Sequence, residues 1–361
     1  MAETPVAVAA SRPLKLRRVA AWRGIRALAW DGDALYGCRG YQIVRLRVSP
    51  QTAENAKWEV VTRFRSAWWR NLTSRSALSY RLLRDGFHAL AVLGSQTMVG
   101  AVPGALVTRA ADHDEFHVTH QVQRGTRPLH ITAVPSGSIY WGEYFDNRER
   151  VEVHIYVSTD RGCTWQIAYT FPAGSVRHVH NIVYDRWSDC LWILTGDEGT
   201  ECKVLRASCD LRSVEVVLSG NQQARTVAAI PTQNGLYLST DTPSEKNHVY
   251  RLDRVGNVEQ VGDLASSSIY GCRVDEAMFF STMVEPSAVN ASREVHLAAS
   301  RDGTNWQVLA RWTKDNLSMR YFQYGNAFLP DGENATRYLA ATTIAVKSDD
   351  LVTKLWEVES A

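Results

Sequence analysis

The sequence predicts an all-β protein, a β-propeller of seven four-stranded blades. Three observations lead to this fold class. One hairpin pattern recurs along the whole chain, its copies are nearly evenly spaced, and turn residues separate the strands of each copy. A propeller arranges such hairpins around a central axis, so that each blade packs against two neighbours. Six blades are the alternative if one copy is spurious.

The repeated unit is an apolar strand, a polar turn with Gly, Asp or Asn, and a second strand rich in Leu, Tyr, Phe or Trp. This is the pattern of a β-hairpin. The copies begin at Arg23, Arg84, Arg127, Arg177, Ala224, Ile269 and Arg320. Most are separated by about 45 to 60 residues, the length of a four-stranded blade. A β-sandwich, the structural runner-up, would not need one hairpin repeated in this way.

One stretch departs from the strand pattern, RFRSAWWRNLTSRSALSYRLLRDGFH near residues 63–88. Leu78 and Leu82 are four residues apart, and Ala77 and Tyr80 are three apart. Helical spacing over this window predicts a short helical insertion, which we place inside the second blade. It would serve either as a lid over an apolar edge or as a wall of a binding cleft.

The composition is that of a globular chain without a general electrostatic preference. Of the 361 residues, 45% are hydrophobic and 22% are charged, and the net charge is +2. This balance gives no overall attraction to nucleic acid or to an anionic membrane, and no apolar run reaches the about 18 residues of a membrane span. We treat residues 1–361 as one propeller domain, with residues 1–14 as a flexible or strand-donating N-terminus.

The cysteines and the first residues bear on the compartment. None of the 6 cysteines forms a CxxC pair, so a thiolate zinc site is not expected. The N-terminal segment has no basic start followed by an apolar core, as a signal peptide would. We therefore expect a cytoplasmic protein with reduced thiols in its core.

Two turns share a short motif that fixes their local geometry. STDRGCTW occupies residues 158–165 and SRDGTNW occupies residues 300–306, with a degenerate third copy, SCDLRSVE, at Ser208. Asp160 and Asp302 are expected to accept hydrogen bonds from backbone N–H groups of the turn. The glycine of each motif permits a positive φ. The closing Trp would then pack onto its blade.

These motifs resemble the Asp-box, Ser-x-Asp-x-Gly-x-Thr-Trp, of sialidase-like propellers with BNR repeats. Roughly residues 126–330 are similar to a bacterial, polysaccharide-associated group of such proteins. The matching stretches are WGEYF at Trp141, RHVHNIVYD at Arg177, LTGD at Leu194, STDTPSEKN at Ser239 and FQYGN at Phe322. The resemblance implies a propeller with its Asp-box turns on the face away from the active site, and a role connected with carbohydrate.

Two columns of polar side chains are expected to meet at one mouth of the channel. Adjacent strands of a blade run antiparallel, so innermost strands begin on the face where second strands end. The first column holds Arg127, His130, Arg177, His178, His180, Gln223, Arg225, Tyr270 and Gln323, with Arg26 and His88. The second holds Glu143, Asp197, Asp241 and Glu285, with Glu245 and Asn247 in the loop after Asp241. Strand centres are Ala, Val, Ile and Leu, so packing does not explain these polar positions.

His178 and His180 are two residues apart on one strand, which points both rings to the same face. They could share a divalent metal ion, with His130 or Gln223 completing the ligands. They could instead act as general base and orienting group. A third interpretation is that they bond Asp197 or Glu143 and make the mouth rigid. No other cofactor is expected.

The leading functional hypothesis is a glycoside hydrolase acting on an acidic or modified bacterial polysaccharide or oligosaccharide. The catalytic candidates are Asp197, Glu143, His180, Tyr270 and Asp241. The substrate-binding candidates are Arg127, His130, Arg177, His178, Gln223, Arg225, Glu245, Asn247, Glu285 and Gln323. One alternative is a polysaccharide lyase with a His or Tyr base and an Arg or metal at the sugar carboxylate. Another is a non-catalytic propeller that binds glycans or scaffolds polysaccharide-assembly proteins.

Overall fold

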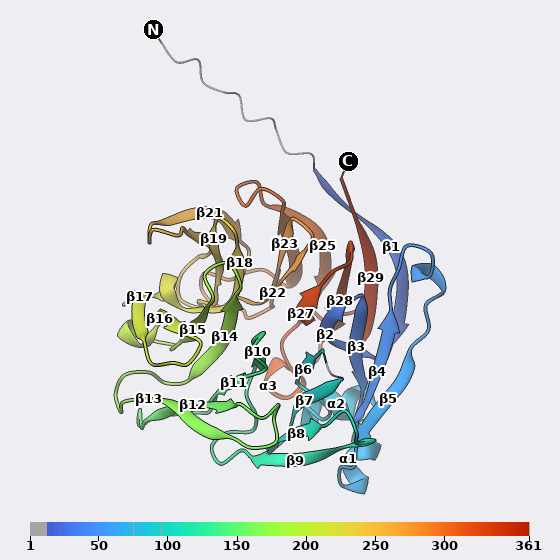
Figure 1. Ribbon diagram of the computed structural model, residues 1–361. Helices are drawn as coiled ribbons and strands as arrows, with labels where there is room; N and C mark the ends of the chain where they lie inside the picture. Colours follow the sequence, from blue (N-terminus) through green and yellow to red (C-terminus); the bar gives the residue numbers. More distant parts are fainter. Residues whose placement is uncertain (1–12, 75, 95, 361) are drawn as a thin grey trace.

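The computed structural model describes residues 13–74, 76–94 and 96–360, and its strands form seven four-stranded blades around a centre (Figure 1). The predicted all-β propeller is confirmed, with seven blades rather than six. Within a blade the strands pair antiparallel with their neighbours, from an innermost strand beside the channel to an outermost strand at the periphery.

The first six blades follow the order of the chain. The first is β2 (Arg26–Gly32), β3 (Ala34–Arg39), β4 (Gln42–Arg47) and β5 (Glu59–Phe64), and the second is β6 (Ala89–Leu93), β7 (Thr97–Val102), β8 (Ala105–Arg109) and β9 (Glu115–Gln121). The third is β10 (Thr132–Ala133), β11 (Ile139–Gly142), β12 (Val153–Ser158) and β13 (Gln166–Phe171), and the fourth is β14 (Val179–Asp185), β15 (Cys190–Thr195), β16 (Lys203–Ser208) and β17 (Val214–Ser219). The fifth is β18 (Thr226–Thr232), β19 (Gly235–Thr240), β20 (Asn247–Leu252) and β21 (Val258–Leu264), and the sixth is β22 (Ser268–Val274), β23 (Ala277–Thr282), β24 (Glu294–Ser300) and β25 (Gln307–Thr313).

The seventh blade joins the two ends of the described chain. Its strands are β26 (Asn326–Phe328), β28 (Tyr338–Ile344), β29 (Val352–Ser360) and, outermost, β1 (Leu14–Arg23). β1 pairs antiparallel with β29 along its whole length, so backbone hydrogen bonds close the ring of blades. Residues 1–12, expected to be flexible or to donate a strand, lie outside the described residues.

Two parallel pairings connect elements of different blades. β5 pairs with β9 at the outer edges of the first and second blades, which therefore form one continuous sheet. β27 (Asp331–Asn334), in the segment between β26 and β28, pairs with β2 of the first blade. The seventh and first blades are thus held together by backbone as well as by side chains.

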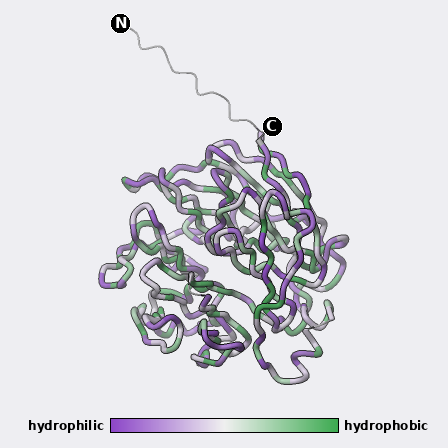
Figure 2. The backbone as a smooth tube through the Cα atoms, turned by 45° about the vertical axis from the view of Figure 1, so that its right-hand side comes forward, coloured by the Kyte–Doolittle hydropathy of each residue, from purple (hydrophilic) through white to green (hydrophobic). Residues whose placement is uncertain are grey.

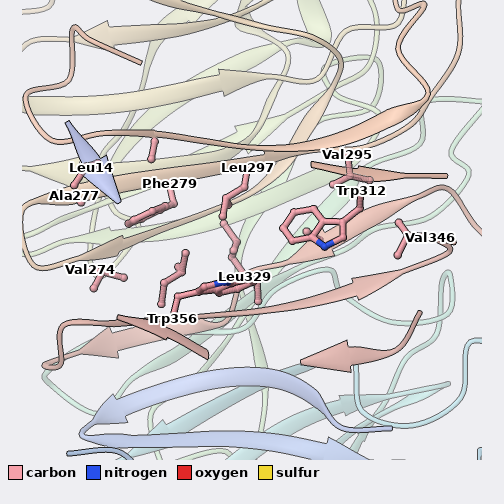
Figure 3. Close-up of a cluster of buried hydrophobic side chains, with 14 of the residues drawn as sticks. Leu14, Val274, Ala277, Phe279, Val295, Leu297, Trp312, Leu329, Val346 and Trp356 are labelled. Carbon is pink, nitrogen blue, oxygen red and sulfur yellow. The ribbon is translucent and has the colours of Figure 1, made fainter. Parts of the chain in front are cut away.

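The apolar core lies between blades. Phe279 and Leu297 of the sixth blade pack with Trp356 of the seventh, and Leu14 of β1 joins the same cluster (Figure 3). Similar clusters fill the other blade interfaces. Apolar and polar stretches alternate along the chain (Figure 2), as expected for strands that pack on both faces and turn at their ends.

The predicted helical insertion is confirmed as α1 (Trp68–Thr73) and α2 (Ala77–Leu83). The two helices lie in the connection from β5 to β6, between the first two blades rather than inside the second. α2 packs against α1 and against α3 (Met319–Phe322). Single 3-10 turns occupy Ala53–Asn55, Gly199–Glu201 and Gln222–Ala224. No helix of the described residues combines the length and apolarity that crossing a membrane requires.

Both Asp-box-like turns have the predicted hydrogen bonds. Asp160 Oδ1 accepts from the amides of Cys163 and Thr164, and Asp302 Oδ1 accepts from those of Thr304 and Asn305. These turns connect the third and fourth strands of a blade, which places them at the end of the blade away from the start of its innermost strand.

The glycines of these turns lie against the preceding blade. Gly162 has φ 88° and a Cβ there would come within 2.4 Å of Val99, while Gly303 has φ 78° and a Cβ would come within 2.0 Å of Tyr237. Only glycine meets both demands, since it has no Cβ and tolerates positive φ. The turns therefore fix blade against blade, which is a structural role.

Candidate functional site

One end of the central channel holds a cavity of about 290 Å³, the mouth cavity. It lies where innermost strands begin and second strands end, as the antiparallel blades require. Arg26 begins β2, Asp197 comes two residues after β15, and Asp241 directly follows β19. Tyr80 of α2 and Gln323 at the end of α3 close one side. Two groups of charged side chains contribute to this cavity, one with an excess of carboxyl groups and one with an excess of arginines.

The first group, the carboxylate half, comprises Asp146, Arg177, His178, His180, Asp197, Arg225, Asp241 and Glu285. Asp197 is at its centre. Its Oδ2 lies 3.1 Å from Nη1 of Arg177 and 3.4 Å from Nε2 of His178. Its Oδ1 lies 3.3 Å from Nε2 of His180 and 3.4 Å from Nη2 of Arg225. Burial alone would raise the pKa of Asp197, but the hydrogen bonds to His178 and His180 hold that pKa well below its usual range.

Each arginine of this half also contacts a second carboxylate. Arg177 Nη2 lies 2.6 Å from Asp146, and Arg225 Nη2 lies 3.5 Å from Asp241. Asp241 is 5% exposed, and burial raises its pKa to about 7, an effect that the nearby charge of Arg225 opposes. Asp241 is therefore a carboxyl group that exchanges its proton near neutral pH.

The two imidazoles of this half face each other through their Nε2 atoms, 3.0 Å apart. Nδ1 of His178 lies 3.1 Å from the carbonyl oxygen of Phe145, and Nδ1 of His180 lies 3.0 Å from that of Thr226. A carbonyl oxygen only accepts, so each Nδ1 carries a proton. A neutral ring then presents a lone pair at Nε2, and a protonated ring donates from Nε2 to Asp197. Burial lowers the pKa of His180, against the hydrogen bond to Asp197, which raises it.

The second group, the arginine half, comprises Arg26, Tyr80, Arg84, His88, Arg127 and Tyr270. Arg26 is 8% exposed; its Nη2 donates to the carbonyl of His88 at 3.1 Å, and its Cζ lies 3.9 Å from the ring centre of Phe328. Arg127 donates to the carbonyl of Arg84 at 3.0 Å. Among the residues that the structure describes, no Asp or Glu forms an ion pair with these three arginines.

This surplus of positive charge perturbs the titration of the arginine half. Burial, together with the charges of Arg26 and Arg84, lowers the pKa of Arg127 to about 10. Burial also lowers the pKa of His88 well below its ordinary value, with the charges of Arg127 and Arg26 adding to the shift. His88 is therefore neutral at pH 7, and the guanidinium groups of buried Arg26 and half-buried Arg127 are available to an anion.

Most of the residues predicted from the two columns do come together. Those that line the mouth cavity are Arg127, His180, Asp197, Arg225, Asp241, Tyr270, Glu285 and Gln323. Arg177 and His178 do not line the cavity themselves but contact Asp197, which does. The side-chain amide of Gln323 donates to the carbonyl of Arg81 and so positions α2 rather than facing a ligand.

Five predicted residues lie elsewhere, and each has a local partner that explains why. Glu143 is 2% exposed and binds Nε of Arg124 at 2.9 Å and the amide of His154 at 2.8 Å. His130 lies 3.0 Å from Asp331 and lines the wide cavity of about 1470 Å³ at the other end of the channel.

The remaining three belong to loops beside the mouth. Gln223 and Glu245 bond each other on the surface. Asn247 is buried, and its Nδ2 donates to the carbonyl of Thr242 and to Oδ1 of Asn290. None of the three contributes to the wall of the mouth cavity.

Several residues of the wall were not predicted as site residues. Tyr80 and Arg84 come from the helical insertion, which was expected as a lid or as the wall of a binding cleft, but neither residue was named as a site residue. Tyr144 directly follows Glu143, and its ring lies 4.3 Å from that of His178. Extending the strand-end column by one residue would have found Tyr144, since neighbouring residues of an extended chain point to opposite sides.

Solved structures with the same fold are numerous, and their sequences are very different. The WD40 β-propeller domain of Doa1 matches with a TM-score of 0.57 at 8% identity, over 95% of this chain and 97% of that one. The β-propeller domain of Cps50 (Swd1) from Myceliophteria thermophila matches with a TM-score of 0.57 at 11% identity, over 96% and 100% of the two chains. A chain of the Mitotic Checkpoint Complex matches with a TM-score of 0.56 at 10% identity, over 99% and 96%.

At such low identity these likenesses establish the β-propeller fold and nothing finer. No family model matches the chain, and no curated protein matches it. The sialidase-like assignment therefore receives no support beyond the fold itself, although the two turns are built as their sequence predicts.

The glycoside hydrolase hypothesis and the lyase alternative are wrong. The three solved propellers named above are described as a WD40 domain, a β-propeller domain and a chain of the Mitotic Checkpoint Complex, and none of these descriptions is that of a glycosidase or lyase. The geometry agrees. A glycosidase needs two carboxyl groups free to act on one bond, whereas Glu143 is paired outside the cavity and Asp197 is surrounded by two arginines and two histidines. A polysaccharide substrate is withdrawn with the enzymatic hypothesis.

Proposed function

We propose that this chain is a non-catalytic propeller that binds a partner protein on a surface beside the mouth cavity. The observation that carries this proposal is a cluster of exposed apolar side chains on α1, α2 and the segment around α3, the helical platform. Its members are Trp68, Trp69, Leu72, Leu78, Leu82, Leu83, Leu317, Tyr321 and Tyr324. Soluble proteins rarely leave so many large apolar groups together in water unless they bind something there.

The exposure on the platform is large. Trp68 is 79% exposed, Leu72 is 63% exposed, and Tyr321 is 55% exposed. Trp and Tyr are the residues that most often carry binding energy in protein interfaces, because they bury much area with little loss of side-chain freedom. A partner that covers these groups would gain hydrophobic free energy at about 25 cal/mol per Å² of apolar area.

The platform is held firmly to the propeller. Arg81 of α2 is 2% exposed and pairs with Asp315 and Asp350, and it also donates to the carbonyl of Phe322. Asp85 is buried and accepts from Tyr41, Arg70 and Thr73. A surface fixed in this way loses little conformational entropy when a partner binds.

The arginine half of the mouth cavity indicates the chemistry of the partner. Tyr80 of α2 and Arg84 at its end belong to the cavity wall, so the platform and the guanidinium groups of Arg26 and Arg127 are adjacent. We propose that the partner offers an apolar segment to the platform and an Asp, a Glu or a terminal carboxylate to these arginines. The 6 free cysteines support a reducing, cytoplasmic setting for this interaction.

Comparison of matched variants tests the proposal. Trp68→Ser with Leu72→Ser removes apolar area from the platform, while Val216→Ser with Val258→Ser removes it from outer strands, where these residues are 53% and 43% exposed. A protein retained from native lysate by the wild type and the outer-strand variant, but not by the platform variant, would then be purified. Its Kd, measured by isothermal titration calorimetry, should rise at least about tenfold for the platform variant.

Two results would overturn the proposal. One is a partner whose Kd is the same for the platform and outer-strand variants. The other is binding of a glycan, with no bound protein, that Arg26→Met and the platform variant leave unchanged.

A further inference from the structure

The carboxylate half contains three donor atoms that converge on one point. Nε2 of His178, Nε2 of His180 and a carboxylate oxygen of Asp197 all lie within 4.8 Å of one another. The two rings are 5% and 3% exposed as whole residues, and Asp197 and His180 belong to the wall of the mouth cavity. The convergence is thus built into the protein interior and opens on one side.

Hydrogen bonds at Nδ1, on the far side of each ring from the three donor atoms, fix the orientation of both rings. The Nδ1 atoms donate to the backbone carbonyls of Phe145 and Thr226, at 3.1 and 3.0 Å. When both rings are neutral, this leaves two Nε2 lone pairs facing each other across 3.0 Å, beside a carboxylate. Lone pairs repel at that distance unless a positive charge lies between them. Ligand histidines characteristically donate their other N–H to a backbone carbonyl or carboxylate in this way.

The separations of the donor atoms suit one ion. Nitrogen ligands about 2.0–2.1 Å from a tetrahedral zinc ion lie about 3.3 Å apart, and in an octahedral shell about 3.0 Å apart. The observed separations are 3.0 Å between the Nε2 atoms, 3.4 Å from Nε2 of His178 to Oδ2 of Asp197 and 3.3 Å from Nε2 of His180 to Oδ1 of Asp197. With one ligand atom from each residue, all three atoms lie within 4.8 Å of one another, so a cation among them would draw the carboxylate toward the two rings.

The local charge also favours a divalent cation. The arginines that contact Asp197 are each bound to a further carboxylate, Arg177 to Asp146 and Arg225 to Asp241. With Glu285, whose charge acts on Arg225, the carboxylate half has four carboxyl groups and two guanidinium groups. When all are ionised, the excess is two negative charges, which one divalent ion neutralises.

We propose that His178, His180 and Asp197 bind one divalent transition-metal ion of the zinc class in the wall of the mouth cavity. Two imidazoles with one carboxylate suit Zn²⁺, Co²⁺ or Ni²⁺, whereas Mg²⁺ and Ca²⁺ prefer oxygen ligands alone. Because Asp197 and His180 belong to the cavity wall, water or a donor group of a ligand in the cavity would complete the shell. This site is independent of the protein-binding proposal, since the helical platform contributes none of the three ligands.

Binding of Co²⁺ to the full chain, after EDTA treatment and removal of the chelator, tests the proposal. We expect the chain to bind one equivalent of Co²⁺ and to show the visible absorption bands of protein-bound Co²⁺. These bands should disappear when Zn²⁺ is added, because Zn²⁺ displaces the Co²⁺. His180→Ala and Asp197→Asn should each abolish this uptake. His296→Ala should retain it, because His296 also lies on a strand, 3.5 Å from Glu294, but has no third ligand within the part of the chain that the structure describes.

A second measurement uses the wild type alone and does not depend on variants that fold. In imidazole ¹H–¹⁵N correlation spectra, Zn²⁺ should shift the Nε2 signals of two histidines while their Nδ1 signals remain protonated. Folded wild-type protein that takes up no stoichiometric Co²⁺ or Zn²⁺ would overturn the proposal, and so would uptake that leaves His178 and His180 unshifted. In either case the two rings would share a proton in place of a metal ion.

Discussion

The two halves of the mouth cavity carry opposite unbalanced charge. In the carboxylate half, every arginine is bound to carboxylates, and carboxyl groups are in excess. In the arginine half, Arg26 donates to the carbonyl of His88 and Arg127 to that of Arg84, and no Asp or Glu of the described residues forms an ion pair with either. Both halves contribute to the wall of one cavity, so their difference arises from which charged residues the surrounding strands and loops present.

The pKa shifts in each half follow from the kind of charge that is in excess there. In the carboxylate half, burial raises the pKa of Asp241 to about 7, so that group resists becoming negative. In the arginine half, burial lowers the pKa of Arg127 to about 10 and keeps His88 neutral, so that half resists further positive charge. A cation suits the first half and an anion suits the second, which is why we assign a metal ion to one and an acidic group of a partner to the other.

The largest loss of stability is expected when Asp197, the central residue of the carboxylate half, is replaced. Asp197→Ala leaves Arg177, Arg225 and both imidazoles without their shared acceptor. Breaking a buried ion pair by removing one partner costs about 3–5 kcal/mol, and we expect about 4 kcal/mol here, because the side chain of Asp197 is only 14% exposed. Chemical denaturation of metal-free protein measures the loss.

A matched control separates burial from ion pairing as such. Asp146 contacts the same arginine, Arg177, but is 55% exposed. Exposed pairs contribute about 0–1 kcal/mol, so Asp146→Asn should change stability by less than about 1 kcal/mol. An equal loss of unfolding free energy in the two variants would show that the buried ion pairs of Asp197 stabilise the chain no more than the exposed pair of Asp146.

The second prediction concerns the pH dependence of stability in the carboxylate half. The pKa of Asp241 is raised from 3.8 to about 7 in the folded chain, so the native state binds more protons than the unfolded state between these values. The stabilisation by protonated Asp241 is complete below the unfolded pKa and is lost as pH rises through about 7.

At about 1.4 kcal/mol per pKa unit, this contribution is at most about 4 kcal/mol. Asp241→Asn removes the titration, so the unfolding free energy of wild type minus variant should fall steadily between pH 4 and pH 7. The measurement is urea unfolding at several pH values in EDTA. A difference that stays flat, or rises with pH, would contradict the raised pKa.

The fold could be predicted because its signal is local and repeated. Each hairpin copy marks the start of a blade: the copy at Arg177 precedes β14 (Val179–Asp185), and the copy at Ala224 precedes β18 (Thr226–Thr232). Antiparallel pairing then fixes which strand ends share a face. This is why His180, Asp197 and Arg225, distant in sequence, were correctly expected at one mouth.

The failures have a physical cause as well. A strand-end position fixes the face of the propeller but not the direction of the side chain, so Glu143 turns to Arg124 and the amide of His154 instead of the cavity. The platform depends on Arg81 reaching Asp315, a contact across most of the chain that no local pattern encodes. The enzymatic hypothesis came from a resemblance and from residue types, and neither specifies whether a carboxylate is free or already paired.

The smallest predicted change in stability is that of Arg26→Met, and we compare it with the same Arg-to-Met substitution at Arg225 in the other half. Arg26→Met keeps an unbranched stem against Phe328 and removes a buried charge that has no carboxylate partner among the described residues. Replacing such a group by an apolar one of similar volume is often stabilising, so we expect a gain of about 1 kcal/mol. Arg225→Met should instead destabilise the chain, because it leaves Asp197 and Asp241 buried without their guanidinium. Thermal and urea unfolding of the two variants measure the sign of each change in stability. Changes in the same direction would mean that the two halves do not differ in charge balance in the way their contacts indicate.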